Sequence, residues 1–191
     1  MALLYENKIP MNREAFVAKI KEICSKLGIN PNWLMFCINL ETAGTFSHTI
    51  VNSIGATGLI QFLQSTAVGL GTTTAALRQM TNVQQLDYVY KYLKPHASQF
   101  NSFEDVYCAI FYPAAIGKPD TYVITSDAVA RANPLFDINK DLDITKLEIR
   151  TKLYSLVPND FKSEFLKKKQ HENTRLYFYC RVRCTFSNIG L

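Results

Sequence analysis

Residues 41–62 read ETAGTFSHTIVNSIGATGLIQF, and the rest of the sequence is best interpreted from this segment. It begins with a carboxylate, Glu41, and contains no other acidic residue. A glycine-rich turn, GATG at residues 55–58, divides it, and apolar residues follow. The pattern predicts a helix that ends near Glu41, a loop of small and polar residues, and a short helix over residues 59–67.

Two helices are predicted up to Glu41. The first has apolar residues at helical spacing between Asn12, a candidate N-cap, and Gly28, a candidate C-cap. The second follows Asn30, another candidate N-cap, and carries Glu41 on the same face as its apolar residues. Burial of a carboxylate raises its pKa, so that it stays protonated near neutral pH and can act as a general acid. A Glu held in a helix cap or salt bridge is the alternative interpretation.

The fold is predicted to be mainly α. Downstream helices follow the same spacing, the last of this series ending before Pro113. No strand is evident through residue 116, whereas residues 175–186 alternate between apolar and polar side chains as a half-buried strand does. We therefore expect a compact helical domain over residues 1–132 and a small C-terminal extension over residues 133–191, packed on that domain.

The composition indicates a soluble globular protein, with 48% hydrophobic and 19% charged residues. No apolar run is long enough to span a membrane, and no signal peptide is visible at the N-terminus. The net charge of +5 comes without a basic stripe or known motif, so no nucleic acid partner is predicted. Five cysteines without metal-binding spacing favour buried free thiols, in particular Cys24, Cys37 and Cys108.

Three segments together resemble a known family. They are Glu41-Thr42, GATGLIQ at residues 55–61 and FYPAA at residues 111–115. They are similar to the signature of the soluble lytic transglycosylases, in the goose-type lysozyme superfamily: a Glu with a small residue, Gly-Ala-x-Gly-Leu-Met-Gln, and Ala-Tyr-Asn-Ala-Gly. The resemblance covers residues 12–118 and implies a lysozyme-like helical domain. Pro113 departs from the pattern, because the family usually has Asn there.

The resemblance implies cleavage of the β-1,4 bond between N-acetylmuramic acid and N-acetylglucosamine in bacterial peptidoglycan. Glu41 would act first as acid and then as base, and the muramoyl C6 hydroxyl would attack C1 to give a 1,6-anhydro product. Because the nucleophile belongs to the substrate, the reaction needs no second carboxylate. The matching substrate-binding positions are Asn52, Ser53, Gly58, Gln61 and Tyr112, and Tyr112 is also a candidate hydrogen-bond partner of Glu41.

Two other functions stay open at this stage. A goose-type hydrolase would need a second group near the cleft, for which Asp87, Glu104 and Asp105 are candidates. A glycan-binding or phage tail structural protein without activity is favoured by Pro113. The small size and the lack of a visible signal peptide favour a bacteriophage enzyme. Such an enzyme is made in the host cytoplasm and acts on the cell wall after release or within a virion.

Residues 137–148, DINKDLDITKLE, resemble the EF-hand calcium loop. The residues on loop positions 1, 3, 5, 9 and 12 are Asp137, Asn139, Asp141, Thr145 and Glu148. Leu142, however, stands where the loop needs a Gly. The sequence leaves two interpretations open, a structural calcium ion or a capping box in which Thr145 and Glu148 start a helix. The implied reaction needs no cofactor, and no catalytic metal is predicted.

Overall fold

The computed structural model describes residues 2–125 and 127–166. This part of the chain is mainly helical, as predicted, with one two-stranded antiparallel sheet. The α-helices are α1 (Arg13–Leu27), α2 (Pro31–Glu41), α3 (Gln64–Gly69), α4 (Thr74–Gln79), α5 (Asn82–Leu93), α6 (Phe103–Phe111), α7 (Asp127–Ala132), α8 (Lys146–Leu156) and α9 (Lys162–Phe165). The strands are β1 (Val123–Thr125) and β2 (Ile144–Thr145), and short 3-10 helices cover Glu6–Lys8, Lys94–Gln99, Pro113–Ala115 and Asn159–Phe161.

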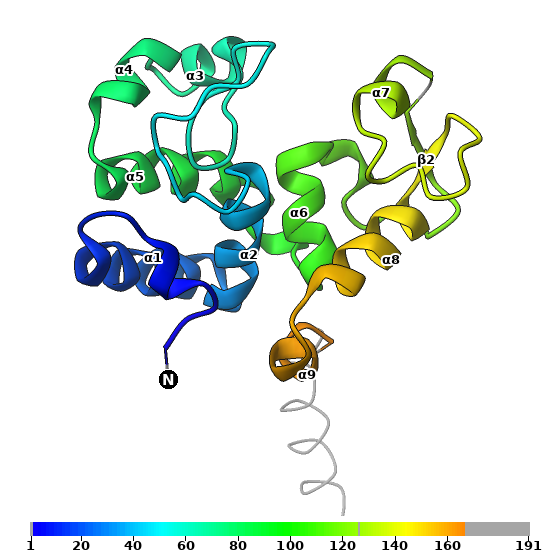
Figure 1. Cartoon of the computed structure of the whole chain (residues 1–191), viewed down its shortest axis with the longest axis horizontal. Helices are drawn as coiled ribbons and strands as arrows, with labels where there is room; N and C mark the ends of the chain where they lie inside the picture. The colour runs from blue at the N-terminus through cyan, green and yellow to red at the C-terminus, as the bar shows by residue number, and fades with distance from the viewer. Residues whose placement is uncertain (1, 126, 167–191) are drawn as a thin grey trace, which may run out of the picture.

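Helices α2 and α6 occupy the middle of the molecule (Figure 1). α1, α3, α4 and α5 lie on one side of them, and α7, α8 and the sheet lie on the other. An aromatic cluster joins the two helices to α9. The ring of Phe103 lies 5.1 Å from that of Phe36 and 4.6 Å from that of Phe165, both edge to face. Edge-to-face packing of buried rings stabilises the junction beyond the effect of their burial.

The predicted cap positions of α1 and α2 are confirmed. Asn30 accepts a hydrogen bond from the Asn32 amide at 2.9 Å, and Gly28 has the left-handed φ of 67° that ends α1. Asn12 is the N-cap residue of α1, as predicted, but its side chain makes no capping hydrogen bond. Its Nδ2 instead donates to Oδ1 of Asn82 at 3.1 Å, which ties the start of α1 to the start of α5.

The prediction of a helix over residues 59–67 is wrong in its start, since α3 begins at Gln64. The backbones of Thr57 and Phe62 exchange two hydrogen bonds, at 2.9 and 2.8 Å, so the intervening residues form a tight loop. Gln61 within it has a φ of 53°, which no α-helix allows. Leu59, Ile60 and Phe62 are buried all the same, because the loop packs on the core, whereas Leu63 is exposed.

The sheet joins the two predicted parts of the chain. β1 precedes the expected boundary at residue 132 and pairs with β2 beyond it, with Val123 opposite Thr145. This sheet was not predicted from the sequence. A buried ion pair between Lys146 and Asp105, at 3.1 Å, fastens the start of α8 to α6. Residues 133–166 therefore pack on the helical domain, whereas the strand predicted for residues 175–186 lies outside the described residues.

Three of the cysteines were predicted to be buried free thiols. Cys24, Cys37 and Cys108 are buried and free, as predicted. Burial raises the pKa of the Cys24 and Cys108 thiols to about 12, so neither is a nucleophile at neutral pH.

Within residues 2–125 and 127–166, none of the helices is long and apolar enough to cross a membrane.

Candidate active site

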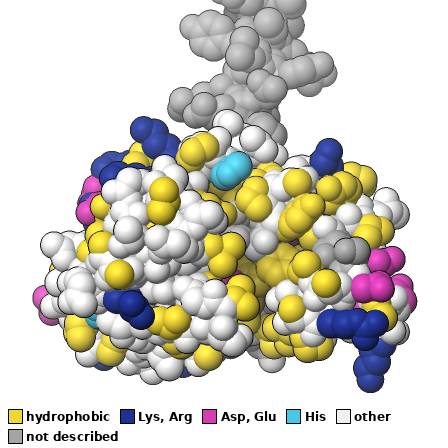
Figure 2. All heavy atoms as spheres, turned by 90° about the horizontal axis from the view of Figure 1, so that it is seen from above, with side chains coloured by type: hydrophobic (Ala, Val, Ile, Leu, Met, Phe, Trp, Pro, Cys, Tyr) yellow, Lys and Arg dark blue, Asp and Glu magenta, His cyan; other side chains and the backbone are white. Residues whose placement is uncertain are grey.

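A pocket of about 450 Å³ lies where the end of α2 meets the 52–63 loop, the end of α6 and α7. Its polar lining consists of Glu41, Asn52, Gln61 and Asn133, and the rest is apolar. Figure 2 shows a hollow with hydrophobic side chains between the two sides of the molecule. The pocket thus sets one carboxylate and a few amides in an apolar wall, the usual composition of a small-molecule site.

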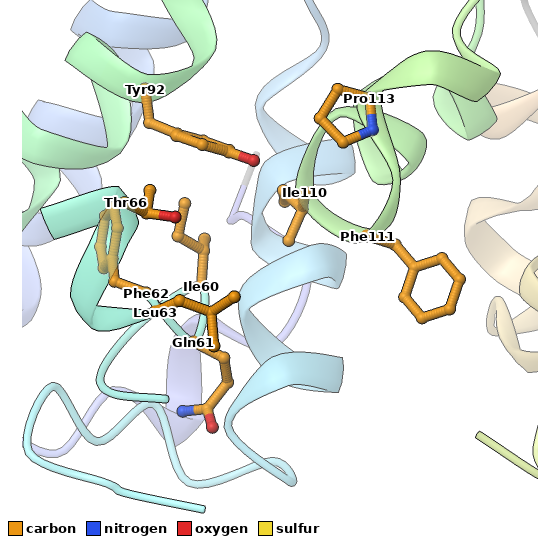
Figure 3. A pocket seen from close by; sticks show the side chains of 9 residues that line it. All are labelled: Ile60, Gln61, Phe62, Leu63, Thr66, Tyr92, Ile110, Phe111 and Pro113. Carbon is orange, nitrogen blue, oxygen red and sulfur yellow. The ribbon is translucent and has the colours of Figure 1, made fainter. Parts of the chain in front are cut away.

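A second hollow of about 270 Å³ adjoins the first. The two share Gln61 together with apolar residues from the loop and from α6. The second hollow adds Thr66, Tyr92 and Pro113, and Figure 3 shows Tyr92 and Pro113 on facing elements. Together the hollows form a groove that runs from Glu41 past Gln61 toward Tyr92, so a ligand longer than one sugar ring has room to lie along it.

Among the residues that line this pocket, Glu41 has a strongly shifted pKa. Burial raises its pKa from the ordinary value of 4.5 to about 7, and a hydrogen bond from the Tyr107 side chain opposes part of that rise. No cationic side chain of the described residues contributes to the pKa. The carboxyl group is therefore present in both protonation states near neutral pH, as a group that alternates between acid and base requires.

The turn after Glu41 fixes where α2 ends. The Thr42 side chain, which has no exposed surface, donates from Oγ1 to the Ile38 carbonyl at 2.7 Å and accepts from the Phe46 amide at 3.0 Å. Gly44 then turns the chain with a φ of 81°, and its amide bonds the Asn39 carbonyl at 2.7 Å. A small hydroxyl residue directly after Glu41 thus closes the helix beneath the pocket.

Tyr107 is the important neighbour of Glu41, and the sequence analysis missed it. It is buried on α6, stacked on Phe111 at 5.9 Å and tilted against Phe136 at 5.5 Å. The expectation that Tyr112 bonds Glu41 is corrected, because Tyr112 is 38% exposed and lines neither hollow. Its neighbour Pro113 begins a short 3-10 helix and lines the second hollow. The sequence could have indicated Tyr107, because it lies one helical turn before the pocket residue Phe111 and therefore on the same face of α6.

Two of the predicted substrate-binding residues line the pocket with Glu41. Asn52 Oδ1 accepts from the Ile54 and Ala56 amides, both at 3.0 Å, and its Nδ2 has no acceptor in the described part of the chain. Gln61 donates from Nε2 to the Gly58 carbonyl at 3.1 Å. Ser53 is exposed on the same loop and does not line the pocket. Asn52 and Gln61 are therefore held by the loop with polar atoms at the pocket wall.

Gly58 was expected to bring backbone close to substrate, but the structure gives it a different neighbour. Gly58 does not line the pocket and faces the buried side chain of Gln85. Gln85 Oε1 accepts from the Leu59 amide at 2.7 Å, and its Nε2 donates to the carbonyls of His48 and Leu77 at 2.9 and 3.1 Å. Gln85, which the sequence analysis also missed, thus joins three separate segments around the GATG turn.

The other candidate carboxylates lie elsewhere. Asp87 pairs with Lys19 at 2.8 Å, Glu104 accepts from the Tyr154 hydroxyl at 2.9 Å, and Asp105 pairs with Lys146. None of the three lines the pocket, whose only acidic residue in the described chain is Glu41. No three His, Cys, Asp or Glu side chains within the described ranges gather closely enough to hold a metal ion.

Replacing Tyr107 with Phe is expected to raise the pKa of Glu41 further, by about one pH unit, because the change removes a donor to the carboxylate and keeps the ring. Carbon-13 NMR titration of the side-chain carboxyl groups measures this, with Glu41 assigned as the resonance lost in Glu41→Gln. Tyr112→Phe is the matched control and should leave the pKa unchanged. A rise in Tyr112→Phe but not in Tyr107→Phe would contradict the arrangement.

No known family model, curated protein or solved structure was found to match this chain. The likeness to the soluble lytic transglycosylases therefore rests on Glu41-Thr42, the GATGLIQ loop and the FYPAA segment. Of these, the first two bring Glu41 and Gln61 to one pocket, and the third contributes Phe111 to it.

Proposed function

We propose that this protein is a peptidoglycan lytic transglycosylase that cleaves the β-1,4 bond between N-acetylmuramic acid and N-acetylglucosamine. The observation that carries the proposal is a single half-buried carboxylate, Glu41, with a pKa of about 7 in a groove whose described lining residues include no second acid. A hydrolase of the two-carboxylate type would need such a second group among them. The resemblance of the Glu41 and GATGLIQ segments supplies the substrate class.

In the proposed reaction the protonated Glu41 donates its proton to the glycosidic oxygen as the bond to C1 breaks. The C6 hydroxyl of the same muramoyl residue then attacks C1, and its proton passes to the Glu41 carboxylate. Glu41 ends protonated, as it began, and the product carries a 1,6-anhydro ring. The intramolecular nucleophile replaces the activated water of a hydrolase, because it is already held next to C1.

The surrounding residues have distinct parts in this proposal. Tyr107 orients the Glu41 carboxyl and stabilises its anionic form through the hydrogen bond. The amide groups of Asn52 and Gln61 bind hydroxyl or acetamido groups of the sugars at the pocket wall. The apolar wall excludes water, which keeps the pKa of Glu41 high. The adjoining hollow beside Tyr92 receives the neighbouring sugar.

Mass spectrometry of purified peptidoglycan digested with the protein tests the proposal. Muropeptides that end in 1,6-anhydromuramic acid are the expected products. Products heavier by one water, with free reducing ends, would make the protein a goose-type hydrolase. Retained binding to peptidoglycan without any product would identify a glycan-binding or tail structural protein, the alternative that Pro113 favours.

We also propose that the enzyme is encoded by a bacteriophage, as an endolysin or a virion-associated lysin that is made in the host cytoplasm. The proposed lytic chemistry, on which this assignment rests, supports it. Proteomics of purified virions and of infected-cell lysates tests it. Secretion of the protein by an uninfected bacterium would contradict it.

A further inference from the structure

The loop at residues 137–148, which leads into α8, contains a buried carboxylate oxygen without a partner. Asp137 is 9% exposed, and its Oδ1 is buried and accepts no hydrogen bond from the described residues. Among the described residues, its Oδ2 accepts only from the Leu142 amide, at 3.3 Å. Burying a charged oxygen without a hydrogen-bond donor costs folding free energy. A cation bound to this oxygen would offset that cost.

The backbone of this loop already has the curvature of a cation-binding loop. Lys140 and Leu142 have φ values of 62° and 70°, a conformation that side chains with a β-carbon rarely adopt. Asn139 accepts from the Asp141 amide at 3.1 Å, and Asp141 accepts from the Asp143 amide at 2.9 Å. These short-range bonds wind the chain around the polar side chains at EF-hand positions 1, 3 and 5. Of these, Asn139 and Asp141 are exposed, and Nδ2 of Asn139 donates to Oδ2 of Asp141 at 2.7 Å.

Glu148 closes the loop from the first turn of α8. Its Oε1 accepts from the Ile138 amide at 3.1 Å, and its Oε2 accepts from the Thr145 amide at 2.9 Å. The capping box predicted for Thr145 and Glu148 is thus confirmed, and the same carboxylate also reaches the beginning of the loop. The position-12 carboxylate therefore lies where both ends of the loop meet.

The loop carries an excess of negative charge. It contains the carboxylates of Asp137, Asp141, Asp143 and Glu148 and two cationic side chains, Lys140 and Lys146. Of these two, Lys146 is already paired with the buried Asp105, which lies outside the loop. A divalent cation would offset this concentration of charge.

We propose that residues 137–148 bind one calcium ion. The ligands are the side-chain oxygens of Asp137, Asn139, Asp141, Thr145 and Glu148, with the main-chain carbonyl of Asp143. Calcium takes six to eight oxygen ligands in flexible geometry, which this mixture of carboxylate, amide, hydroxyl and carbonyl oxygens supplies. The carboxylates do not yet converge, and rotation of the side chains on the preformed backbone brings them to the ion.

Ion binding at this loop braces the wall of the active-site groove. Phe136, directly before the loop, packs against Tyr107 at 5.5 Å and against Phe111 at 5.4 Å. Tyr107 in turn lies close enough to the Glu41 carboxyl to lower its pKa. The ion is structural, because it lies behind this aromatic layer and takes no part in the chemistry.

Thermal unfolding of the full-length protein tests the site. After EDTA treatment and dialysis, calcium chloride in large excess over its Kd is expected to raise Tm by about 5–10 °C, and magnesium chloride is expected to raise it less. Isothermal titration calorimetry should give one calcium per chain. An unchanged Tm and no binding heat at millimolar calcium would overturn the proposal.

Asp137→Asn separates ion binding from folding. The variant keeps an oxygen acceptor for the Leu142 amide and removes the unpartnered charge, so its Tm in EDTA should equal or exceed that of the parent protein. Its Tm should no longer respond to calcium. Asp160→Asn, an exposed carboxylate outside the loop, is the control and should respond as the parent does. A full calcium response in Asp137→Asn would place the ion elsewhere and overturn the assignment.

Discussion

Glu41→Gln abolishes the release of muropeptides, with an expected loss of about 10³-fold or more in rate, and the fold remains intact. The substitution keeps the size and the hydrogen-bonding capacity of the side chain and removes only the proton that is donated and taken back. Rates are measured on purified peptidoglycan by chromatography of the soluble products. Asp87→Asn is the matched control, because Asp87 is a half-exposed carboxylate paired with Lys19 outside the pocket.

The same substitution is expected to stabilise the protein in a pH-dependent way. The folded-state pKa of Glu41 is raised from 4.5 to about 7, so the stability contributed by its protonated form is complete below pH 4.5 and is lost as pH rises through 7. In Glu41→Gln no carboxylate ionises at this position, so the variant does not lose this stability as pH rises. The loss in the parent protein amounts to at most about 3 kcal/mol of the free energy of unfolding. The Tm of the variant should therefore exceed that of the parent at pH 8 and match it at pH 4.

Two outcomes would contradict this view of Glu41. Full activity in Glu41→Gln would remove Glu41 from the chemistry, and loss of activity in Asp87→Asn would point to a second carboxylate and to hydrolysis. An equal Tm for Glu41→Gln and the parent at every pH would show that the Glu41 side chain is not desolvated. Activity and stability thus test the same carboxyl group independently.

The parts of the site that follow from local sequence were predictable. Glu41 falls at the end of an apolar helical face, Asn30 caps that helix, and Thr42 closes it through bonds within a few residues. Each of these features depends on neighbours along the chain, which periodicity and capping preferences report. The mainly α fold followed from the same signals.

The parts that depend on distant residues were not predictable. Tyr107 reaches Glu41 from another helix, and Gln85 reaches the GATG turn across 26 residues. The start of α3 was missed because Thr57 and Phe62 satisfy each other's backbone groups, which overrides the helical preference of the apolar residues between them. The sheet was missed for a similar reason, since β2 has only two residues and depends on β1. Tertiary contacts of this kind produce no periodic pattern in the sequence from which they could be predicted.

Gly58→Ala is expected to destabilise the protein by about 3 kcal/mol and to reduce activity with it. An alanine β-carbon at this position would lie 2.7 Å from Nε2 and 2.8 Å from Cδ of Gln85. The Gln85 side chain cannot move aside cheaply, because its three hydrogen bonds join buried backbone groups of the loop and α4. Chemical unfolding with urea, monitored by circular dichroism, measures the loss.

Gly55→Ala is the matched control for backbone strain. Both glycines have a φ of 80°, so alanine carries the same left-handed penalty of about 1–2 kcal/mol at each position. No atom lies within 4 Å of the β-carbon position at Gly55. The difference between the two variants therefore isolates the contact with Gln85 from the conformational cost, and equal losses would disprove the contact.

A double-mutant cycle with Gln85→Ala completes the argument. Gln85→Ala alone leaves the Leu59 amide and the His48 and Leu77 carbonyls without their partner, and should itself cost about 2–3 kcal/mol. In that background Gly58→Ala no longer meets a side chain, so its cost should fall to that of Gly55→Ala. Such non-additivity would mean that Gly58 is required by the Gln85 contact that holds the turn, while Asn52 and Gln61 on the same loop line the pocket. Additive losses would return Gly58 to the role first expected for it, close approach to the substrate.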